Sequence, residues 1–308
     1  MNRFLKKVIG LLFLAKKIYN TLLFQRFRSN SLVINSWIEL YGDSIKHNNW
    51  GDDINFLFIR EIVTQRIFNI HNLYKTSSLK DLDNYLLIGS IIESFSTEKS
   101  SIWGSGAMFG NVPLKIKPKR VYAVRGPLTR NYLLNNGVDC PPIYGDPALL
   151  LPYHYQPCVE KCYKIGLIPH YVDYDNDVIK KIVEKYPNDV VLINMQSYSH
   201  WHDVVDIINQ CEMILSSSLH GLIVSDSYSV PNVWISLSDK IRGGNFKYLD
   251  YFQSVNRNTV SPKKIIAGKN YTLEDLYHWK NEWKQISFNP KPLIDSCPFD
   301  ISLKYYHS

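Results

Sequence analysis

The alternation of short apolar runs with helical patterns between residues 164 and 236 places the strongest constraint on the fold. Buried strands are expected at 164–168, 190–194, 213–215 and 232–236, with helices at 178–186, 204–211 and 219–227 between them. Strands that alternate with helices across short connections indicate a parallel sheet covered on both faces. The second half of the chain is therefore predicted to be an α/β domain.

The first half repeats this pattern less regularly. Apolar runs at 32–40, 83–92, 102–106 and 120–124 read as strands. Helices are expected after Gly51, with Asp52 or Asp53 as the N-cap or as a substrate-binding residue, and from Pro127 to just before Gly137. A proline-containing linker at 152–162 divides the halves, and 308 residues are enough for two domains. We expect an N-terminal segment (1–30), a first domain (31–155) and a second domain (156–308).

The turn from Ser216 to Gly221 is the first candidate for chemistry. A strand runs out into three serines, and His220 then opens the next helix. Free backbone N–H groups and hydroxyls at a helix N-terminus suit a carboxylate or phosphate, and Gly221 permits close approach to the backbone. Ser217, Ser218 and Leu219 would line this anion site. The alternative is that the serines only cap the helix and His220 is a packed residue.

Charged residues at other strand ends extend this candidate site. Arg125 lies at a strand tip just before a helix, at the edge where open α/β sheets bind ligands. Its guanidinium would hold a carboxylate or phosphate, or alternatively form a surface or interdomain salt bridge. His170 follows another strand, and Asp146, more often a cap than a base, follows a third. The loop 239–247 carries Lys240, Arg242 and Lys247, which suit an anionic group or are simply solvated.

The amino-acid composition limits the classes of partner that the protein is expected to bind. Hydrophobic residues make up 45% and charged residues 20%, as in a folded globular protein, and the net charge of +7 favours anionic partners. No basic cluster accompanies a known nucleic-acid module, so nucleic acid is not predicted. Five cysteines without CxxC pairs or metal-ligand spacing indicate reduced thiols in a cytosolic protein and no metal site.

The first 28 residues are basic and apolar. Lys6 and Lys7 precede the apolar run 8–15, and Lys16 and Lys17 follow it. The run lacks a small-residue cleavage site and is too short by itself to span a bilayer. It is typical of an amphipathic helix lying on an anionic membrane, or alternatively of an ordinary helix packed on the body.

Seven motifs in consistent order then reveal a family resemblance. They lie at Asn49–Asp52, Ile102–Gly106, Val124–Thr129, Tyr144–Pro147, Gly166–His170, Ser217–Gly221 and Phe246–Asp250. The series, from about residue 33 to 255, resembles the polysaccharide pyruvyl transferase family. The resemblance implies two Rossmann-like domains with parallel sheets, arranged as in GT-B glycosyltransferases, with the active site in the cleft between them.

The resemblance also implies an activity. The enolpyruvyl unit of phosphoenolpyruvate would be moved onto two hydroxyls of a sugar in a surface polysaccharide or lipid-linked precursor, with release of phosphate and without a cofactor. Arg125 looks like the family's donor-binding arginine and His220 like its acid/base histidine; Asp146 or His170 would be the base. Known members carry Arg-Leu-His where this chain has Ser218-Leu219-His220. Either Lys240, Arg242 or Lys247 supplies the missing charge, or the donor's affinity and identity differ.

Two other functions are compatible with the same residues. A nucleotide-sugar glycosyltransferase of GT-B architecture would also use basic, hydroxyl-lined turns. A non-catalytic glycan- or membrane-binding subunit of a polysaccharide assembly complex would need none of the acid/base groups. The expected location is cytoplasmic, peripheral on the inner face of the membrane through residues 1–28.

Overall fold

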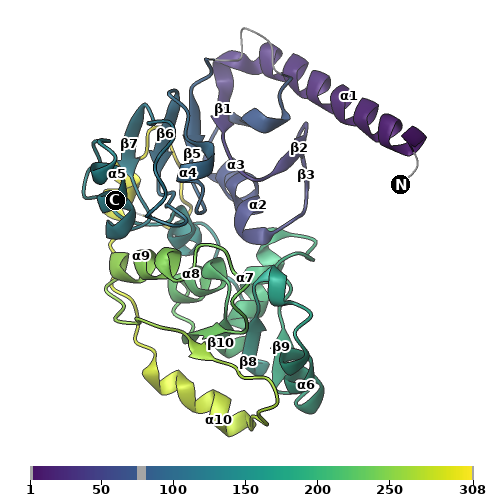
Figure 1. The fold of residues 1–308 in the computed structure, drawn as a ribbon, viewed down its shortest axis with the longest axis vertical. Helices are drawn as coiled ribbons and strands as arrows, with labels where there is room; N and C mark the ends of the chain where they lie inside the picture. Colours follow the sequence, from purple (N-terminus) through teal and green to yellow (C-terminus); the bar gives the residue numbers. More distant parts are fainter. Residues whose placement is uncertain (1–2, 75–80, 307–308) are drawn as a thin grey trace.

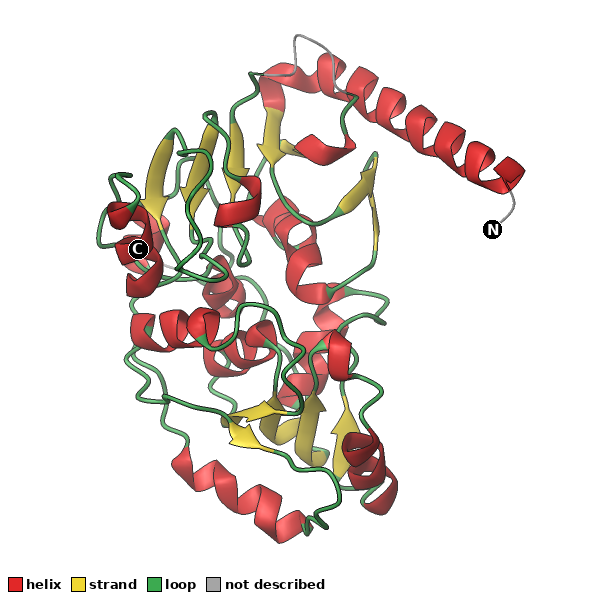
Figure 2. Ribbon diagram, viewed as in Figure 1, coloured by secondary structure: helices red, strands yellow, loops and turns green. Residues whose placement is uncertain are grey.

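The computed structural model describes residues 3–74 and 81–306 and contains two five-stranded parallel sheets (Figures 1 and 2). The first has the order β4-β1-β5-β6-β7. Its strands are β1 (Ser31–Ile34), β4 (Arg66–Asn69), β5 (Asn84–Leu86), β6 (Ser100–Trp103) and β7 (Arg120–Ala123).

The second sheet has the order β12-β11-β10-β8-β9 and is also parallel. Its strands are β8 (Tyr163–Ile168), β9 (Val190–Leu192), β10 (Cys211–Ser216), β11 (Asn232–Ser236) and β12 (Lys263–Lys264). The predicted class, α/β with two Rossmann-like halves arranged in the GT-B manner, is confirmed.

Helices cover these sheets and fill the space between them. Helices α7, α8 and α9 lie between the first sheet and the second (Figure 1). The helices are α1 (Arg3–Phe27), α2 (Trp50–Leu57), α3 (Ile59–Ile62), α4 (Ile92–Phe95), α5 (Pro127–Asn135), α6 (Asp177–Lys185), α7 (Trp201–Asn209), α8 (Leu219–Ser227), α9 (Phe246–Ser254), α10 (Leu273–His278) and α11 (Lys291–Asp295), with 3-10 turns η1 (Arg28–Asn30), η2 (Ile70–Asn72), η4 (Pro147–Tyr153), η5 (Tyr171–Asp173) and η6 (Trp279–Glu282).

The largest hydrophobic core is continuous across both halves. It includes Trp50 and Phe58 from the first half and Trp201 and Leu222 from the second. The backbone N–H of Trp50 donates to Met195 O at 2.7 Å, and its indole N–H donates to Trp201 O at 2.9 Å. Helix α2 is thereby fixed to the second half, close to helix α8.

Two local predictions for the first half are wrong. The expected strand at 32–40 is two pieces, β1 and β2 (Glu39–Tyr41), and β2 pairs antiparallel with β3 (Ser44–Lys46). Helix α2 begins at Trp50 with Asn49 as N-cap, so neither Asp52 nor Asp53 is the cap. Both carboxylates instead lie in the first turn of the helix, where the positive end of the helix dipole favours them.

The segment after β11 also differs from expectation. Residues 239–247 were expected to be one basic loop, but helix α9 starts at Phe246, so Lys247 lies on a helix. The helix predicted at 273–283 is α10 followed by η6, with Thr272 in a capping box as expected. The C-terminal tail returns to the first half, where Trp103 Nε1 donates to Leu293 O at 2.9 Å.

Helix α1 projects away from the body (Figure 1). Its second half is attached through Asn20, Thr21 and Phe24, which are buried. Among the described residues, Val8–Asn30 is the one helical stretch long and apolar enough to cross a membrane by length and composition, a test that signal sequences and buried helices also pass. The apolar run at 8–15 therefore underestimated the apolar length of this segment.

Candidate active site

A buried histidine and a buried aspartate face each other between the two halves. His220 lies in the first turn of α8. Asp146 follows an isolated parallel bridge between Tyr144 and Val124 and caps η4 through Oδ1, which accepts from Ala148 N at 2.9 Å. Asp146 Oδ2 is 3.9 Å from His220 Nε2, beyond hydrogen-bond reach. Neither atom has a hydrogen-bond partner among the described residues. Both roles considered for Asp146, cap and proton-transfer group, are thus compatible with its position.

The absence of a side chain at Gly51 leaves room for the imidazole ring of His220. A Cβ atom added at Gly51 would overlap the imidazole ring at Nδ1. The N-terminus of α2 therefore lies directly against the ring of His220, and a glycine is required there by the close approach rather than by its backbone angles.

The serine turn holds two strand tips together. Ser217 Oγ accepts from His170 N at 2.8 Å, and Ser217 O accepts from the Tyr248 hydroxyl at 2.6 Å. Ser216 Oγ accepts from Ser218 N at 3.0 Å. Ser218 is the N-cap residue of α8, but its own hydroxyl makes no capping bond and is partly exposed.

Two residues of this turn have packing positions. Leu219 is 5% exposed and belongs to the main core. A Cβ at Gly221 would overlap Ser216 Oγ and press on Ile168, so the close approach that Gly221 permits is made by the neighbouring strands. Within this turn Ser218 is partly exposed, whereas Ser217, Leu219 and Gly221 are buried.

Arg125 is fully buried and joins the two halves. Its Nε donates to Asp250 Oδ2 at 2.9 Å, Nη1 to Ser90 Oγ at 2.5 Å and Nη2 to Ala107 O at 2.7 Å. Asp250, on α9, also accepts from the amide and hydroxyl of Thr129. This is the interdomain salt bridge considered from the sequence, and it presents Arg125 to the site as a fixed positive charge.

Lys247 is the second buried cation. It is 7% exposed on the first turn of α9, its ammonium is 5.3 Å from the centre of the Tyr248 ring, and it forms no ion pair or hydrogen bond with the described residues. Burying an ammonium without a carboxylate partner is unfavourable, so the position is typical of a lysine that binds an anionic ligand. By contrast, the side chains of Lys240 and Arg242 are exposed and have no partner in the described part of the chain.

The electrostatics of the cluster shift several pKa values. Burial, together with the positive charges of Arg125 and Lys247, lowers the pKa of His220 to about 3. Burial raises the pKa of Asp146 to about 7, with Ala148 N and Arg125 opposing the rise. At neutral pH His220 is therefore neutral, and Asp146 is close to its midpoint of titration.

Three neighbouring ionisable groups also have shifted pKa values. Burial lowers the pKa of Lys247 to about 8, with Arg125 adding to and Asp52 opposing the shift. Burial raises the pKa of Asp52 to about 6, and Lys247 opposes that rise. Burial and Lys247 lower the pKa of His170 to about 4. These mutual effects show that Asp52, Lys247 and His170 belong to one electrostatic cluster with His220.

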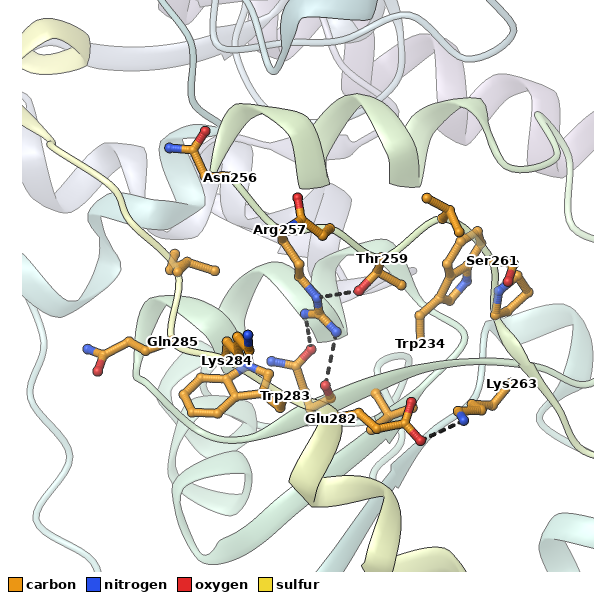
Figure 3. Close-up of a pocket in the computed structure, with 16 residues that line it drawn as sticks. Trp234, Asn256, Arg257, Thr259, Ser261, Lys263, Glu282, Trp283, Lys284 and Gln285 are labelled. Carbon is orange, nitrogen blue, oxygen red and sulfur yellow. Dashed lines mark hydrogen bonds and ion pairs between the residues drawn. The ribbon is translucent and has the colours of Figure 1, made fainter.

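A separate cavity lies at the other edge of the second sheet. It has a volume of about 420 Å³ and is lined by the first residues of β11 and β12 and by residues 256–263 and 282–286 (Figure 3). Its most prominent cation, Arg257, is committed to Asp226 and Asn232. The facing pair of unpartnered atoms, His220 Nε2 and Asp146 Oδ2, lies outside this cavity, so we assign the candidate site to that pair. Within the described residues no cluster of three or more His, Cys, Asp or Glu side chains is arranged to hold a metal.

Sequence reasoning missed Asp250 and Gly51 as members of this site. Both act through contacts more than 120 residues away in the chain, Asp250 with Arg125 and Gly51 with His220. The run Phe246–Asp250 was noticed only as a motif. Its helical spacing, with Lys247 and Asp250 three residues apart on one face, was the available signal.

The protein is thus an α/β protein with two parallel sheets, in which segments from both halves surround a buried histidine–aspartate pair and buried cations. The family model described as polysaccharide pyruvyl transferase matches residues 114–239, which include Arg125, Asp146, His170 and His220. The match confirms, over this span, the resemblance to the family that the sequence motifs indicate.

Two relatives extend the similarity beyond the matched span. An uncharacterized protein of Acanthamoeba polyphaga mimivirus is 26% identical over 241 residues, covering 75% of this chain and 80% of that protein. The succinoglycan biosynthesis protein ExoV of Rhizobium meliloti (strain 1021) is 27% identical over 230 residues, covering 71% of this chain and 65% of ExoV. The family and this second relative support a transferase that acts in polysaccharide biosynthesis.

Proposed function

We propose that this protein transfers the enolpyruvyl group of phosphoenolpyruvate onto two hydroxyls of a sugar in a surface polysaccharide or its lipid-linked precursor. The observation that carries the proposal is the buried pair of unpartnered atoms, His220 Nε2 and Asp146 Oδ2, beside two buried cations. The cations suit a donor with a carboxylate and a phosphate, and the pair suits proton transfer.

The reaction balances with these groups alone. A proton is added to the methylene carbon of the donor, which becomes a methyl group and leaves an oxocarbenium-like centre at the adjacent carbon. One sugar hydroxyl adds to this centre and loses its proton to a base. A second hydroxyl then displaces phosphate through cleavage of the C–O bond, and its proton leaves with the phosphate, which completes the ketal. The proton given to the methylene carbon is thus regained from the first hydroxyl, and the proton of the second hydroxyl is carried away by the phosphate.

We assign the source of the transferred proton from the pKa shifts of Asp146 and His220. Before the donor binds, Asp146 holds a proton near neutrality and His220 does not, because their pKa values are shifted to about 7 and about 3. A bound donor brings negative charge beside His220, Arg125 and Lys247, which raises the pKa of His220 and favours the imidazolium. In this proposal Asp146 supplies the proton that His220 delivers to the methylene carbon.

Other charged groups bind and activate the substrates. Lys247 pairs with the donor's phosphate or carboxylate, which offsets the cost of its own burial. Arg125 contributes its charge from its buried position, and Ser218 with the N-terminus of α8 adds hydrogen-bond donors. In this proposal Asp52, which is half-buried on α2 of the first half, accepts a hydrogen bond from the acceptor sugar. His170 lies next to Ser217 and is the alternative base.

Ligand protection separates this proposal from a nucleotide-sugar glycosyltransferase. A ligand that binds only the folded protein raises its unfolding temperature in proportion to the logarithm of ligand concentration over Kd. We expect phosphoenolpyruvate to protect and UDP-sugars to have no effect. Protection by a UDP-sugar and none by phosphoenolpyruvate would transfer the assignment to the glycosyltransferase.

A second experiment separates an enzyme from a non-catalytic subunit. The protein is incubated with phosphoenolpyruvate and lipid-linked glycan extract, and a pyruvyl adduct is sought by mass spectrometry while released phosphate is measured. His220→Ala is expected to abolish phosphate release and retain the fold. His278→Ala, at an exposed position on α10, is the matched control and is expected to keep full activity. Absence of adduct with the unaltered protein would favour the subunit, and normal release from His220→Ala would exclude His220 as the acid.

The location follows from the same proposal. All five cysteines are free, which supports a reducing compartment such as the cytoplasm. Phosphoenolpyruvate and lipid-linked precursors would meet there at the inner face of the membrane.

A further inference from the structure

Helix α1 exposes an apolar face that the rest of the protein does not cover. Leu11, Ile18 and Leu22 are 60%, 43% and 60% exposed. They are separated by seven and four residues, so they lie on one side of the helix. Leu12 (60% exposed) and Leu14 (40% exposed) widen this surface. A soluble protein rarely leaves so many large apolar side chains together in water, so the face is built for a partner.

The opposite side of the same helix is attached to the first half. Asn20 Nδ2 donates to Leu40 O at 2.9 Å, Asn20 Oδ1 accepts from Gly42 N at 2.8 Å, and Thr21 Oγ1 accepts from Tyr74 N at 2.7 Å. Phe24 packs edge-on against Phe68, with ring centroids 5.4 Å apart. The helix therefore has a fixed orientation, with one side on the protein and the apolar face directed outward.

The charge of the helix identifies the partner. Residues 3–28 contain Arg3, Lys6, Lys7, Lys16, Lys17, Arg26 and Arg28 and no acidic residue. Arg26 and Arg28 are exposed. An exposed apolar face combined with a purely basic helix matches an anionic lipid surface, where leucines enter the acyl boundary and cations contact the headgroups. A second copy of the chain would present the same positive charge and be repelled.

We propose that α1 lies flat on an anionic phospholipid bilayer and anchors the protein to it as a peripheral membrane protein. A spanning orientation would place Lys16 and Lys17 near the bilayer centre and would break the bonds of Asn20 and Thr21 to the first half. The lying orientation keeps both. At a rise of 1.5 Å per residue, the 25 residues of α1 provide a contact about 37 Å long. This inference stands independently of the proposed transfer reaction.

The test measures binding of the full chain to vesicles by co-sedimentation. Vesicles of phosphatidylcholine alone are compared with vesicles that also contain phosphatidylglycerol, at low and high salt. We expect binding to the anionic vesicles at least tenfold tighter than to the neutral ones, with the difference reduced by salt. Equal binding to both vesicles, or none to either, would overturn the proposal.

A pair of triple variants tests the face itself. Leu11→Gln, Ile18→Gln and Leu22→Gln together should reduce vesicle binding more than tenfold without changing the melting temperature, because these side chains are exposed. The matched control is Ile116→Gln, Val260→Gln and Ile266→Gln, three exposed apolar residues elsewhere, and should bind like the unaltered chain. Normal vesicle binding by the α1 variant overturns the proposal. If that variant also converts a dimer to a monomer, the partner that covers the apolar face of α1 is a second copy of the chain. Resistance of bound protein to alkaline carbonate extraction would instead indicate that the helix spans the bilayer.

Discussion

At the residue scale, His220 and Asp146 make opposite contributions to the pH dependence of stability. The pKa of Asp146 is raised to about 7 in the folded state, so its contribution to stability is complete below its ordinary pKa of 3.8 and is lost as pH rises through about 7. The pKa of His220 is lowered to about 3, so its contribution is present above 6.5 and is lost as pH falls toward 3. The two effects partly cancel between about pH 4 and 6.5.

Replacing Asp146 removes one of these two opposing contributions to stability. Asp146→Asn keeps the Oδ1 acceptor for Ala148 N but cannot ionise. We predict that its free energy of unfolding, relative to the unaltered protein, increases by about 2–4 kcal/mol between pH 4 and 7, since each pKa unit corresponds to about 1.36 kcal/mol. Urea unfolding at a series of pH values measures this. Asp295→Asn, at an exposed ion pair with Lys291, is the control. A constant difference across the pH range would show that Asp146 keeps an ordinary pKa.

Lys247 allows binding and stability to be separated. Lys247→Met retains the aliphatic contacts and removes a buried ammonium that has no anionic partner among the described residues. We predict donor affinity reduced about 10- to 100-fold, as for loss of one charge-assisted hydrogen bond, with equal or higher thermal stability. Calorimetric titration with phosphoenolpyruvate and a thermal melt provide the two readouts, with exposed Lys240→Met as control. Unchanged affinity with lower stability would make Lys247 a structural residue.

These residues also show how far the sequence predicts the site. His220, Asp146 and Arg125 were located because each follows an apolar strand, and the ends of parallel strands meet at one edge. Their pairing was not predictable, because the contact of His220 with Asp146 depends on how the two halves are packed. The interdomain salt bridge of Arg125 was the alternative to a ligand-binding role, and spacing along the chain contains no information that decides between them.

At the element scale, helix α2 restricts the position of the His220 ring. Gly51→Ala would introduce a Cβ into the space of the His220 imidazole. We predict a destabilisation of about 1–3 kcal/mol, as for overpacking, together with a loss of turnover. In the His220→Ala background the added methyl group finds room, so the penalty should disappear. A double-mutant cycle from urea unfolding measures this coupling. Equal penalties in both backgrounds would mean that the added methyl group meets some other obstacle.

Element boundaries were predicted best where the pattern was regular. The strands and helices from β8 to β11 agree with the sequence within a few residues, because short apolar runs alternate there with amphipathic segments. Only the first two residues of helix α9 were taken for loop, because Gly243 and Gly244 precede them closely. Strand β4 was missed because a four-residue strand carries little periodic signal.

At the scale of the whole molecule, the two halves share one core and one buried ion pair, so the proposed substrate binding would depend on the same residues as the interdomain packing. The hydrophobic cluster containing Trp50 and Trp201 crosses the boundary, and Arg125 connects strand ends of the first sheet to Asp250 on α9. The proposed donor site is therefore complete only when the halves are packed together.

Arg125→Lys tests this dependence. A lysine cannot reach Ser90, Ala107 and Asp250 together. The buried carboxylate of Asp250 would therefore lose part of its pairing with a positive charge, at a cost of about 3–5 kcal/mol. We predict weaker phosphoenolpyruvate binding and, by scanning calorimetry, two separate unfolding transitions in place of one. The matched control is Arg257→Lys, because Arg257 pairs with Asp226 in a buried site within the second half. That variant should be destabilised as well, yet it should keep a single transition and normal donor affinity. If Arg125→Lys retained stability and lost only affinity, Arg125 would contact the donor directly, as the sequence first suggested, and the coupling of the halves would depend on the shared core alone.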